Sequence, residues 1–467
     1  IEYIMNEFQH TLKQPAELEG IGLHTGQSVK VRICPSEANT GIIFHRVDLE
    51  GDIRIKADVD YVSSVERGTT LERQGVKVAT VEHVLAALFG CQVDNALIEI
   101  NGEEIPILDG SSKPFVDAIL EAGIEEQGEE REYYEVRETI RFYDEEKDAE
   151  ILVLPDSTFK STVLIDYQSN ILGQQHASLE DVSEFNESFS EARTFCFLHE
   201  LESLLDRGLI KGGDLNNAIV VVDHELEEEE LNRLRALFNK PDVEVEQGIL
   251  NNVALRYPNE CARHKLLDFV GDLALAGMPI KGNFIASRPG HSTNVAFAKS
   301  IKAKIKAWKA APQAPTYDQD SPPLYDLVAI QKLLPHRYPF LLVDKIVHLD
   351  RKEVVGVKSV TFNEYYFRGH FPNNPVMPGV LQIEAMAQVG GIFALSQVED
   401  DGDYDTYFLK IQKARFKAMV VPGDTLIIQC ILMSPIRRGL VEMRGLGFVG
   451  SKLVVEAELM AKIQKRE

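Results

Sequence analysis

The sequence predicts a multidomain α+β protein with two separate catalytic sites. Its 467 residues are enough for about three domains of ordinary size. A segment with four prolines and no hydrophobic period, residues 311–323, divides the chain and is expected to be an extended, semi-rigid linker. Different sets of histidine and carboxylate side chains lie on the two sides of this segment. One active site cannot use both sets, so we expect a fusion of two enzymes.

The composition is that of a globular protein and argues against some classes of partner. Hydrophobic residues make up 44% of the chain and charged residues 26%, so each domain can bury a core. The formal net charge of −24 argues against a nucleic-acid or anionic-membrane surface, because both require basic patches. The acidic runs at residues 125–138 and 225–230 are interpreted as solvated surface.

The cysteines and the apolar segments bear on the cellular compartment. Five cysteines without CxxC spacing fit a reducing cytoplasm better than a disulfide framework. Residues 1–10 show neither the basic nor the apolar region of a secretion signal. The long apolar stretch at residues 380–397 contains Gln382, Glu384 and Gln388, so we expect a buried helix and no transmembrane segment. A cytoplasmic protein is expected.

Two helices predicted in the first half carry the candidate metal site. Residues 80–90 have an apolar body, a glycine stop and Thr80 as the expected N-cap. Glu82 and His83 then lie in the first turn. Residues 259–277 begin with an Asn cap after a proline. Three polar residues of this second helix are spaced i, i+4 and i+8 and share one face: His264, Asp268 and Asp272.

The spacing of these residues is compatible with a catalytic metal centre. His264 and Asp268 can reach one ion because they project from the same helix face. His83 is the best candidate for a third ligand, and two histidines with one carboxylate leave a fourth position for water, as in catalytic zinc sites. Glu82 could take the proton of that water as general base. On spacing alone, the alternative is a surface pair between His264 and Asp268.

The second half contains a possible acid–base pair and no set of metal ligands. Glu384 is the only charged residue between Gly379 and residue 397. A carboxylate in an apolar helix is costly to bury, so it is expected to have a partner or a catalytic task. His370 precedes this helix. The alternatives are a salt-bridged core glutamate and a histidine that is merely hydrogen-bonded.

Several motifs occur in a characteristic order in the first half. They are residues 20–26, 79–88, 192–195 and 208–213, the helix with His264, and Gly290-His291. Together they resemble the zinc-dependent UDP-3-O-acyl-N-acetylglucosamine deacetylases of lipid A biosynthesis (the LpxC family) over about residues 11–305. The resemblance implies two layered α/β domains, residues 11–128 and 129–305, with the active site between them.

The resemblance assigns seven side chains to the deacetylase centre. Matched to this chain, the zinc ligands are His83, His264 and Asp268, the base is Glu82, the general acid is His291, the carboxylate that orients it is Asp272, and the hydroxyl at the oxyanion is Thr194. One zinc ion per chain is implied. The implied reaction is hydrolysis of the 2-acetamido group by zinc-activated water, with His291 protonating the departing amine.

Further positions match the substrate contacts of the family. Lys265 and Arg288 fall where the family meets phosphate or sugar, and cations suit the diphosphate of a UDP-acyl-glucosamine. The family has lysine at the position of Arg288, which makes this match the weaker of the two. Phe195 and residues 209–213 fall near the passage for the acyl chain.

The second half carries an independent set of motifs. They are residues 333–344, 369–381, 384–388, 413–417 and 421–424. They resemble the (3R)-hydroxyacyl-acyl carrier protein dehydratases of fatty acid biosynthesis (the FabZ family) over about residues 324–467, after a linker at 306–323. The implied fold is the hot dog, an antiparallel sheet around one long apolar helix. Glu384 stands where the related isomerising dehydratase has aspartate, so dehydration alone is expected.

In the implied dehydration, His370 removes the proton α to the thioester and Glu384 protonates the departing 3-hydroxyl. The backbone N–H of Gly379 would face the thioester carbonyl. No cofactor is implied for this half. In the family the two catalytic residues of one site come from different subunits, so a dimer is the minimum assembly and a hexamer is expected.

A basic cluster near this site is a candidate surface for the acidic acyl carrier protein. Its members are Lys410, Lys413, Arg415 and Lys417, and the alternative is an ordinary solvated strand. Two other readings of the whole chain are a deacetylase fused to a hot-dog thioesterase and one fused to a non-catalytic oligomerisation module. Loss of a reactive residue would favour the latter, and neither half shows such a loss.

Overall fold

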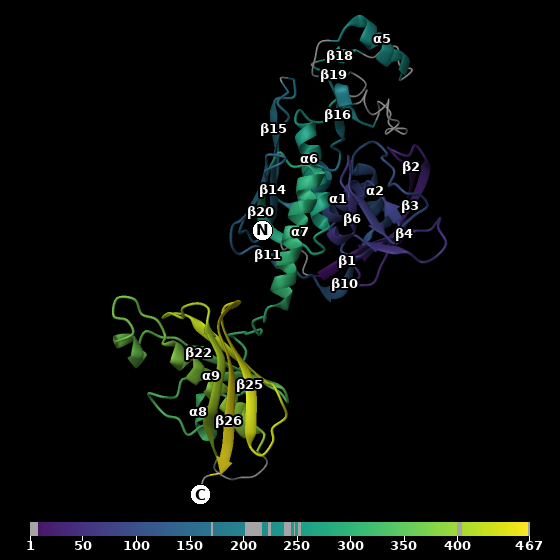
Figure 1. Cartoon of the computed structure of the whole chain (residues 1–467). Coiled ribbons are helices and arrows are strands. Elements are labelled where there is room, and N and C mark those ends of the chain that lie inside the picture. Colours follow the sequence, from purple (N-terminus) through teal and green to yellow (C-terminus); the bar gives the residue numbers. More distant parts are fainter. Residues whose placement is uncertain are drawn as a thin grey trace. The chain divides into compact units, whose positions relative to one another are not determined.

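The computed structural model describes residues 8–169, 171–200, 217–222, 226–237, 244–246, 248–250, 254–398 and 404–465. The chain forms two compact units, Ile1–Lys306 and Ala307–Glu467. Each unit contains helices and sheets (Figure 1). The mixed α and β character predicted from the sequence is confirmed for both.

The first part of unit one is built on a five-stranded sheet with the order β2-β3-β9-β4-β5. Side chains of β3 alternate between buried and exposed and those of β9 between buried and half-buried, so one sheet face points into a core. Helices α1 (Glu82–Gly90) and α2 (Lys113–Ala122) supply apolar side chains to the same core. The strands are β2 (Ala16–Ile21), β3 (Ser28–Pro35), β4 (Ile42–Arg46), β5 (Arg54–Lys56) and β9 (Ala96–Ile100).

Smaller elements flank this sheet. A two-stranded ribbon joins β1 to β10, and a three-stranded sheet has the order β6-β7-β8. Their bounds, with one 3₁₀ turn, are β1 (Phe8–Leu12), β10 (Ile124–Glu130), β6 (Val62–Ser64), β7 (Thr70–Arg73), β8 (Val76–Val78) and η1 (Val59–Tyr61). The loop before β7 contacts the side chain of Glu82 on α1.

The second part of unit one has a six-stranded sheet with the path β12-β13-β20-β14-β15, and β11 pairs with β20. Helices α6 (Glu260–Ala274) and α7 (His291–Ala310) pack on it through a second core. The remaining elements are β11 (Tyr134–Glu135), β12 (Ile140–Asp144), β13 (Ala149–Leu154), β14 (Phe159–Asp166), β15 (Gln174–Leu179), β20 (Ile280–Ser287), η2 (Val182–Glu184) and α3 (Phe185–Ser188).

A small sheet with the order β16-β17-β19-β18 and helix α5 complete the described part of unit one. Their bounds are β16 (Phe195–Phe197), β17 (Ile219–Val221), β18 (Val245–Glu246), β19 (Ile249–Leu250) and α5 (Glu228–Leu237). A separate apolar cluster that includes Leu198, Val220 and Leu234 lies beneath them.

The expected N-cap of α1 is wrong. The helix begins at Glu82 with Val81 as the cap residue, and no side chain caps it. The Thr80 hydroxyl instead donates to the buried carboxylate of Glu104, at 3.3 Å. That carboxylate also accepts the backbone N–H groups of His24 and Thr25. A contact distant in sequence therefore overrides the local capping preference.

The second unit is one antiparallel sheet with a long helix against it. The strand order is β21-β22-β24-β25-β26-β23, and helix α9 (Gly379–Ser396) packs on the sheet (Figure 1). Glycines let the helix lie close: a Cβ at Gly445 would meet Met386 Sδ at 2.0 Å, and one at Gly356 would meet Val389 at 2.5 Å. The other bounds are α8 (Leu327–Leu333), η3 (Tyr365–Arg368), β21 (Lys345–Leu349), β22 (Glu353–Ser359), β23 (Tyr404–Phe416), β24 (Thr425–Leu432), β25 (Leu440–Val449) and β26 (Lys452–Lys465).

Helix α9 is unusually apolar along its whole length. By length and composition it could cross a membrane, and it alone among the described helices passes that test. The core helix of a globular domain has the same properties, and 61% of α9 is buried within this unit. The expectation of a buried helix at residues 380–397 is confirmed.

The proline-rich linker is partly docked on the second unit. Ala314 and Tyr317 pack against an apolar cluster on the sheet, formed by Val355, Ile427, Leu446 and Phe448. Lys345 Nζ also lies 5.1 Å from the centre of the Tyr317 ring. The linker thus covers a patch of sheet that would otherwise face water.

Replacing Tyr317 with alanine should expose this patch and lower the unfolding free energy of the second unit by about 1–2 kcal/mol, because part of an aromatic side chain loses its apolar contacts. Thermal inactivation of the second unit's enzymatic activity in the full chain would measure the change. Thr316→Ala, which removes an exposed neighbour, should leave the midpoint unchanged. Equal midpoints for both variants would mean that the docking contributes no stability.

Candidate active sites

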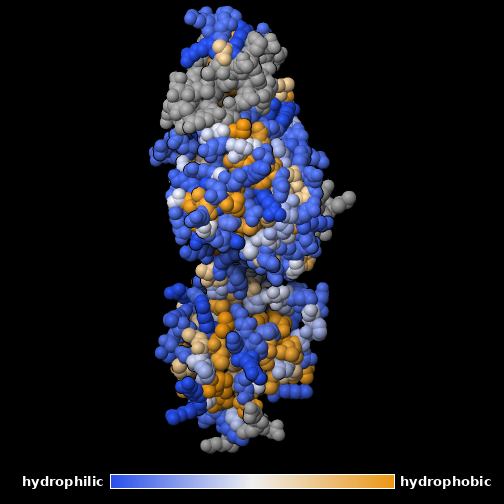
Figure 2. Space-filling model, turned by 90° about the vertical axis from the view of Figure 1, so that its right-hand side faces the viewer, coloured by the Kyte–Doolittle hydropathy of each residue, from blue (hydrophilic) through white to orange (hydrophobic). Residues whose placement is uncertain are grey.

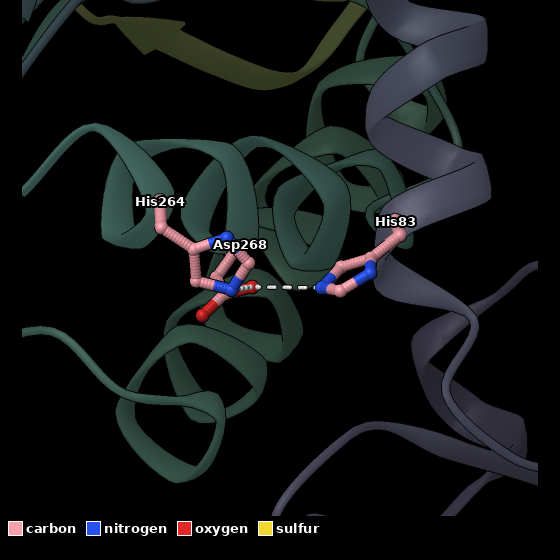
Figure 3. Close-up of side chains that lie close together, drawn as sticks. All are labelled: His83, His264 and Asp268. Carbon is pink, nitrogen blue, oxygen red and sulfur yellow. Dashed lines mark ion pairs between the residues drawn. The ribbon is translucent and has the colours of Figure 1, made fainter. Parts of the chain in front are cut away.

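Three potential metal ligands converge from two helices. His83 lies in the first turn of α1, and His264 and Asp268 lie one turn apart on α6. Ligand atoms from all three lie within 4.8 Å of one another, and all three residues are buried. Figure 3 shows His83 reaching across to the two side chains of α6, with its Nε2 3.7 Å from Asp268 Oδ1. The structure brings together the set expected from the sequence.

The donor set fits a cation. Asp268 Oδ1 is buried and accepts no hydrogen bond in the part of the chain that the structure describes, a costly state for a carboxylate oxygen unless an ion binds there. His264 Nδ1 lies 3.0 Å from the carbonyl oxygen of Ala192, which turns Nε2 toward Asp268, 3.3 Å away. Burial and the nearby His264 lower the pKa of His83 to about 3, so His83 is neutral and able to ligate.

Glu82 is placed beside this cluster to act on a proton. Its Oε2 accepts the backbone N–H of Thr69 at 2.9 Å, and its Oε1 lies 3.9 Å from His291 Nε2. Burial raises the pKa of Glu82 to about 7, against the opposing charge of His291. A carboxylate with this pKa can accept a proton near neutral pH and release it again.

His291 faces the cluster from the start of α7. Its Nδ1 lies 2.9 Å from Asp272 Oδ2, and its Nε2 lies 3.8 Å from Asp268 Oδ2. Burial alone would lower the pKa of His291, but the carboxylates of Asp272 and Asp268 outweigh it and raise the pKa to about 9. His291 is therefore charged and can donate a proton from Nε2.

These groups line a cavity of about 610 Å³. Thr194 and Phe195 form part of its wall, and so does Lys265. Lys265 Nζ donates to Asp268 Oδ2 at 2.9 Å and lies 5.6 Å from the centre of the Phe195 ring. Burial lowers the pKa of Lys265, but the Asp268 charge outweighs it and raises the pKa overall. This lysine therefore holds a ligand carboxylate in place.

One expected substrate contact does not line the cavity, and another falls outside the described residues. Arg288 does not line it and pairs with Asp148, at 2.6 Å. Residues 209–213, matched to the acyl passage, lie outside the described residues. Tyr167 and Arg67 also line the cavity. Neither was predicted, because neither belongs to a periodic or motif-bearing segment.

The second candidate site lies on α9. Glu384 lines a cavity of about 230 Å³ together with His336, Phe340 and Tyr407. Gln388 Nε2 donates to Glu384 Oε1 at 2.9 Å, and His336 Nε2 lies 3.7 Å from the same oxygen. Glu384 is half-buried and has the partners expected of a carboxylate in an apolar helix, and it also faces a cavity.

Gln388 also anchors the loop above this cavity. Its Oε1 accepts the N–H of Leu342, and its Nε2 donates to the carbonyl of Phe340, at 2.8 and 2.7 Å. One buried amide thus connects α9 to the loop that carries His336 and Phe340. The sequence identified this loop as a motif without giving His336 a role.

His370 and Gly379 complete the predicted set. His370 Nδ1 lies 2.8 Å from the carbonyl oxygen of Val376, an arrangement in which Nδ1 carries the hydrogen and Nε2 is left as a base. His370 is not among the residues lining the Glu384 cavity. Gly379 is the first residue of α9, and a Cβ there would meet the Phe416 ring at 2.7 Å.

Comparison with protein families defines two enzyme classes on this chain. Residues 9–238 and 242–303 match the family of UDP-3-O-acyl N-acetylglycosamine deacetylases (LpxC), and residues 334–458 match the FabA-like domain. The fold class is thus confirmed as a deacetylase followed by a FabA-like dehydratase domain. The two matches fall on either side of the proline-rich linker.

Curated relatives show the same pair of domains. The protein named bifunctional enzyme LpxC/FabZ from Bacteroides thetaiotaomicron is 48% identical over 98% of this chain and 99% of its own length. The proteins of the same name from Porphyromonas gingivalis and Chlorobaculum tepidum are also 48% identical, over 97% and 98% of this chain and 98% and 99% of their own lengths. The chain belongs to the family of bifunctional LpxC/FabZ enzymes. It is an enzyme with deacetylase and dehydratase activities, which confirms the predicted fusion.

Gly271 controls the distance between the two metal-binding helices. A Cβ at this position of α6 would lie 2.2 Å from the carbonyl oxygen of Glu82 on α1, and backbone cannot rotate away as a side chain can. Gly271→Ala should push the helices apart, weaken metal binding by about 10–100-fold and reduce deacetylation accordingly.

Metal content after dialysis against a chelator, with both activities measured, would test this expectation. Dehydration should be unchanged because it is catalysed by the other unit. Gly128→Ala is the matched control, since no atom lies within 4 Å of a Cβ there. Full metal retention and a normal deacetylation rate in Gly271→Ala would show that the crossing does not set the ligand geometry.

Proposed function

We propose that the first unit is a two-domain, layered zinc deacetylase that hydrolyses the N-acetyl group of UDP-3-O-(3-hydroxyacyl)-N-acetylglucosamine in lipid A biosynthesis. The second unit dehydrates (3R)-hydroxyacyl-acyl carrier protein to the trans-2-enoyl product in fatty acid biosynthesis. The observation that carries the first assignment is the buried Asp268 Oδ1, which accepts no hydrogen bond from the described residues and lies between two histidine nitrogens. The five unpaired cysteines support a reducing, cytoplasmic location.

In the deacetylase, His83, His264 and Asp268 would hold one zinc ion. Zinc bound at such a site polarises a carbonyl and activates a water molecule for attack. Glu82 takes the proton of the attacking water, for which its pKa of about 7 is suited. His291, held charged by Asp272, gives a proton to the amine that leaves. The bond broken is the amide C–N bond, and the products are acetate and the free amine.

The remaining proposed roles concern the oxyanion and substrate binding. Thr194 lines the cavity and is the candidate hydroxyl donor to the oxyanion. Phe195 supplies an apolar wall for the acyl chain. Lys265 is directed to Asp268, so any contact with phosphate must share its ammonium group with that carboxylate. Arg288 is the candidate for a diphosphate contact outside the cavity.

The roles of Glu82 and His264 can be separated experimentally. His264→Ala removes a ligand, so it should lose both zinc and deacetylation. Glu82→Gln keeps the three ligands, so it should retain zinc while the rate falls by about 10²–10⁴-fold, as for a lost general base. Zinc content and deacetylation of the purified chain provide the measurement, and dehydration in both variants is the internal control.

Either of two results would contradict the assignment. A His264→Ala protein with stoichiometric, tightly held zinc would move the metal centre elsewhere. A Glu82→Gln protein with near-normal turnover would transfer the base role to another group.

In the dehydratase, the proposed base is His370 and the proposed acid is Glu384. The Nε2 of His370 removes the α proton, because Nδ1 is engaged with Val376. Glu384 protonates the 3-hydroxyl, the C–O bond breaks and water leaves. The N–H of Gly379, at the positive end of α9, stabilises the developing charge on the thioester oxygen.

Homo-oligomerisation would complete this site. The cavity at Glu384 lacks His370 from the same chain, and among the described strands β23 is an edge strand that pairs with β26 alone. Figure 2 shows apolar patches on the surface of the second unit. Exposed apolar side chains on β23 include Tyr407, Leu409, Ile411 and Phe416, and such an edge favours pairing with another chain. We propose a dimer as the minimum and a hexamer as the full assembly.

A shared site predicts complementation between inactive chains. His370→Ala and Glu384→Ala should each abolish dehydration, while co-expressed, purified mixed oligomers regain a minority of intact sites. Chains with different affinity tags would isolate the heteromers, and deacetylation reports that each chain is folded. Heteromers without activity above either parent would place both residues of one site in one chain.

The acyl carrier protein is the proposed partner of the second unit. In the basic cluster, Lys413 Nζ pairs with Glu458 at 2.7 Å, and Arg415 and Lys417 pair with Glu456 at 3.7 and 3.2 Å. An acidic partner must compete with these two carboxylates. The cluster can therefore contribute a salt-sensitive contact but not a strong, unopposed positive surface.

A further inference from the structure

Thr69 joins the two proton-transfer groups of the deacetylase. It lies in the loop before β7 and is fully buried. Its backbone N–H donates to Glu82 Oε2 at 2.9 Å, and its hydroxyl donates to Asp272 Oδ1 at 2.5 Å. Its carbonyl accepts the N–H of Val81, the residue before α1, at 3.2 Å. One residue therefore contacts the base, the start of the helix that carries the base, and the carboxylate that orients the acid.

The Thr69 hydroxyl completes the coordination of a fully buried carboxylate. Asp272 is 0% exposed and, when ionised, can only accept hydrogen bonds. Its Oδ2 accepts from Asn294 Nδ2 and lies beside His291 Nδ1, both at 2.9 Å. Its Oδ1 accepts a hydrogen bond from the Thr69 hydroxyl. With donors on both oxygens, the carboxylate plane is fixed, and so is the ring of His291.

The loop lies close to Glu82 at the preceding residue as well. Gly68 has φ of +159°, and a Cβ there would lie 3.0 Å from Glu82 Oε1. A side chain at position 68 would therefore crowd the carboxylate that Thr69 holds. The loop approaches Glu82 by its backbone, and Thr69 extends past it to Asp272.

We propose that Thr69 is a positioning residue that fixes the base Glu82 and the Asp272–His291 pair relative to each other. The inference rests on the proposed roles of Glu82 and His291. Proton transfer requires both groups at hydrogen-bonding distance from their targets, so a small change in orientation slows the reaction. Thr69 contacts none of the three metal ligands in the described structure, so it acts on the rate and not on metal binding.

Thr69→Val tests this because valine has the shape of threonine and keeps the backbone N–H to Glu82. It removes only the hydroxyl, which donates to Asp272 and also lies 3.5 Å from His291 Nδ1. We expect kcat for deacetylation to fall about 10–100-fold, as for other residues that orient a catalytic group. KM, zinc content and dehydration should stay at wild-type values. Thr69→Ser, which restores the donor, should recover most of kcat.

A matched control separates this role from general loss of a buried hydroxyl. Thr11 is also buried, and its hydroxyl donates to the carbonyl of Asn95 at 2.7 Å, in another part of the same unit. Thr11→Val should leave kcat unchanged. If Thr69→Val does not retain zinc, Thr69→Ala takes its place in the same assays, since a smaller side chain cannot clash with the loop.

A double-mutant cycle with Asp272 decides whether the hydroxyl acts through that carboxylate. Asp272→Asn alone should slow deacetylation, and adding Thr69→Val should cost little more, because the two changes remove the same interaction. Fully additive losses, wild-type kcat in Thr69→Val, or loss of zinc together with kcat in both Thr69→Val and Thr69→Ala would each overturn the inference.

Other variants distinguish a failure of the proposed function from a failure of the Thr69 inference. If Glu82→Gln and His291→Ala both kept the wild-type rate, the acid and base roles themselves would fall. If those two variants lost activity while Thr69→Val did not, only the positioning role of Thr69 would fall.

Discussion

The deacetylase site depends on the close crossing of α1 and α6. The first helix brings Glu82 and His83, and the second brings His264, Asp268 and Asp272. Their backbones meet where Gly271 faces the carbonyl of Glu82, and apolar cores lie on the two sheets that flank this contact. The two helices are held from both sides, so the ligand geometry is set by packing before any ion binds. Pre-organisation of this kind lowers the free-energy cost of ordering the ligands when the ion binds.

The sequence predicts those parts of the sites that follow from local spacing. His264, Asp268 and Asp272 share a helix face by periodicity alone, and Glu384 stands out in an apolar helix. His83 and the order of motifs required resemblance to a family, because nothing in helical spacing joins residue 83 to residue 264. Thr69 gave no signal, since its contacts come from a loop and span 13 and 203 positions in sequence. The prediction of Thr80 as an N-cap was wrong for the same reason. Its hydroxyl donates to Glu104, a contact that local capping rules cannot anticipate.

The two units place their candidate catalytic carboxyl groups in different environments. Glu82 is enclosed and opposite a charged histidine, and burial brings its pKa close to neutrality. Glu384 lies at the edge of an open cavity and is held by the amide of Gln388. The candidate groups of the first site come together among the described residues of one unit, whereas β23 is an edge strand of the second unit's sheet and His370 does not line the Glu384 cavity. Packing within one chain therefore assembles the first set of candidate groups but does not bring His370 to the cavity of Glu384.

The docked linker has a consequence for how long the fusion lasts in the cell. Proteases cut extended, accessible chain, and a proline-rich connection between two enzymes would be an obvious target. Ala314 and Tyr317 are instead seated on the sheet of the second unit, and α7 continues as helix to Ala310. The contacts hold the first part of the linker, whereas residues 318–322 are exposed and form its accessible part. Because both enzymes are made on one chain, they are present in equal numbers for as long as this exposed stretch stays intact.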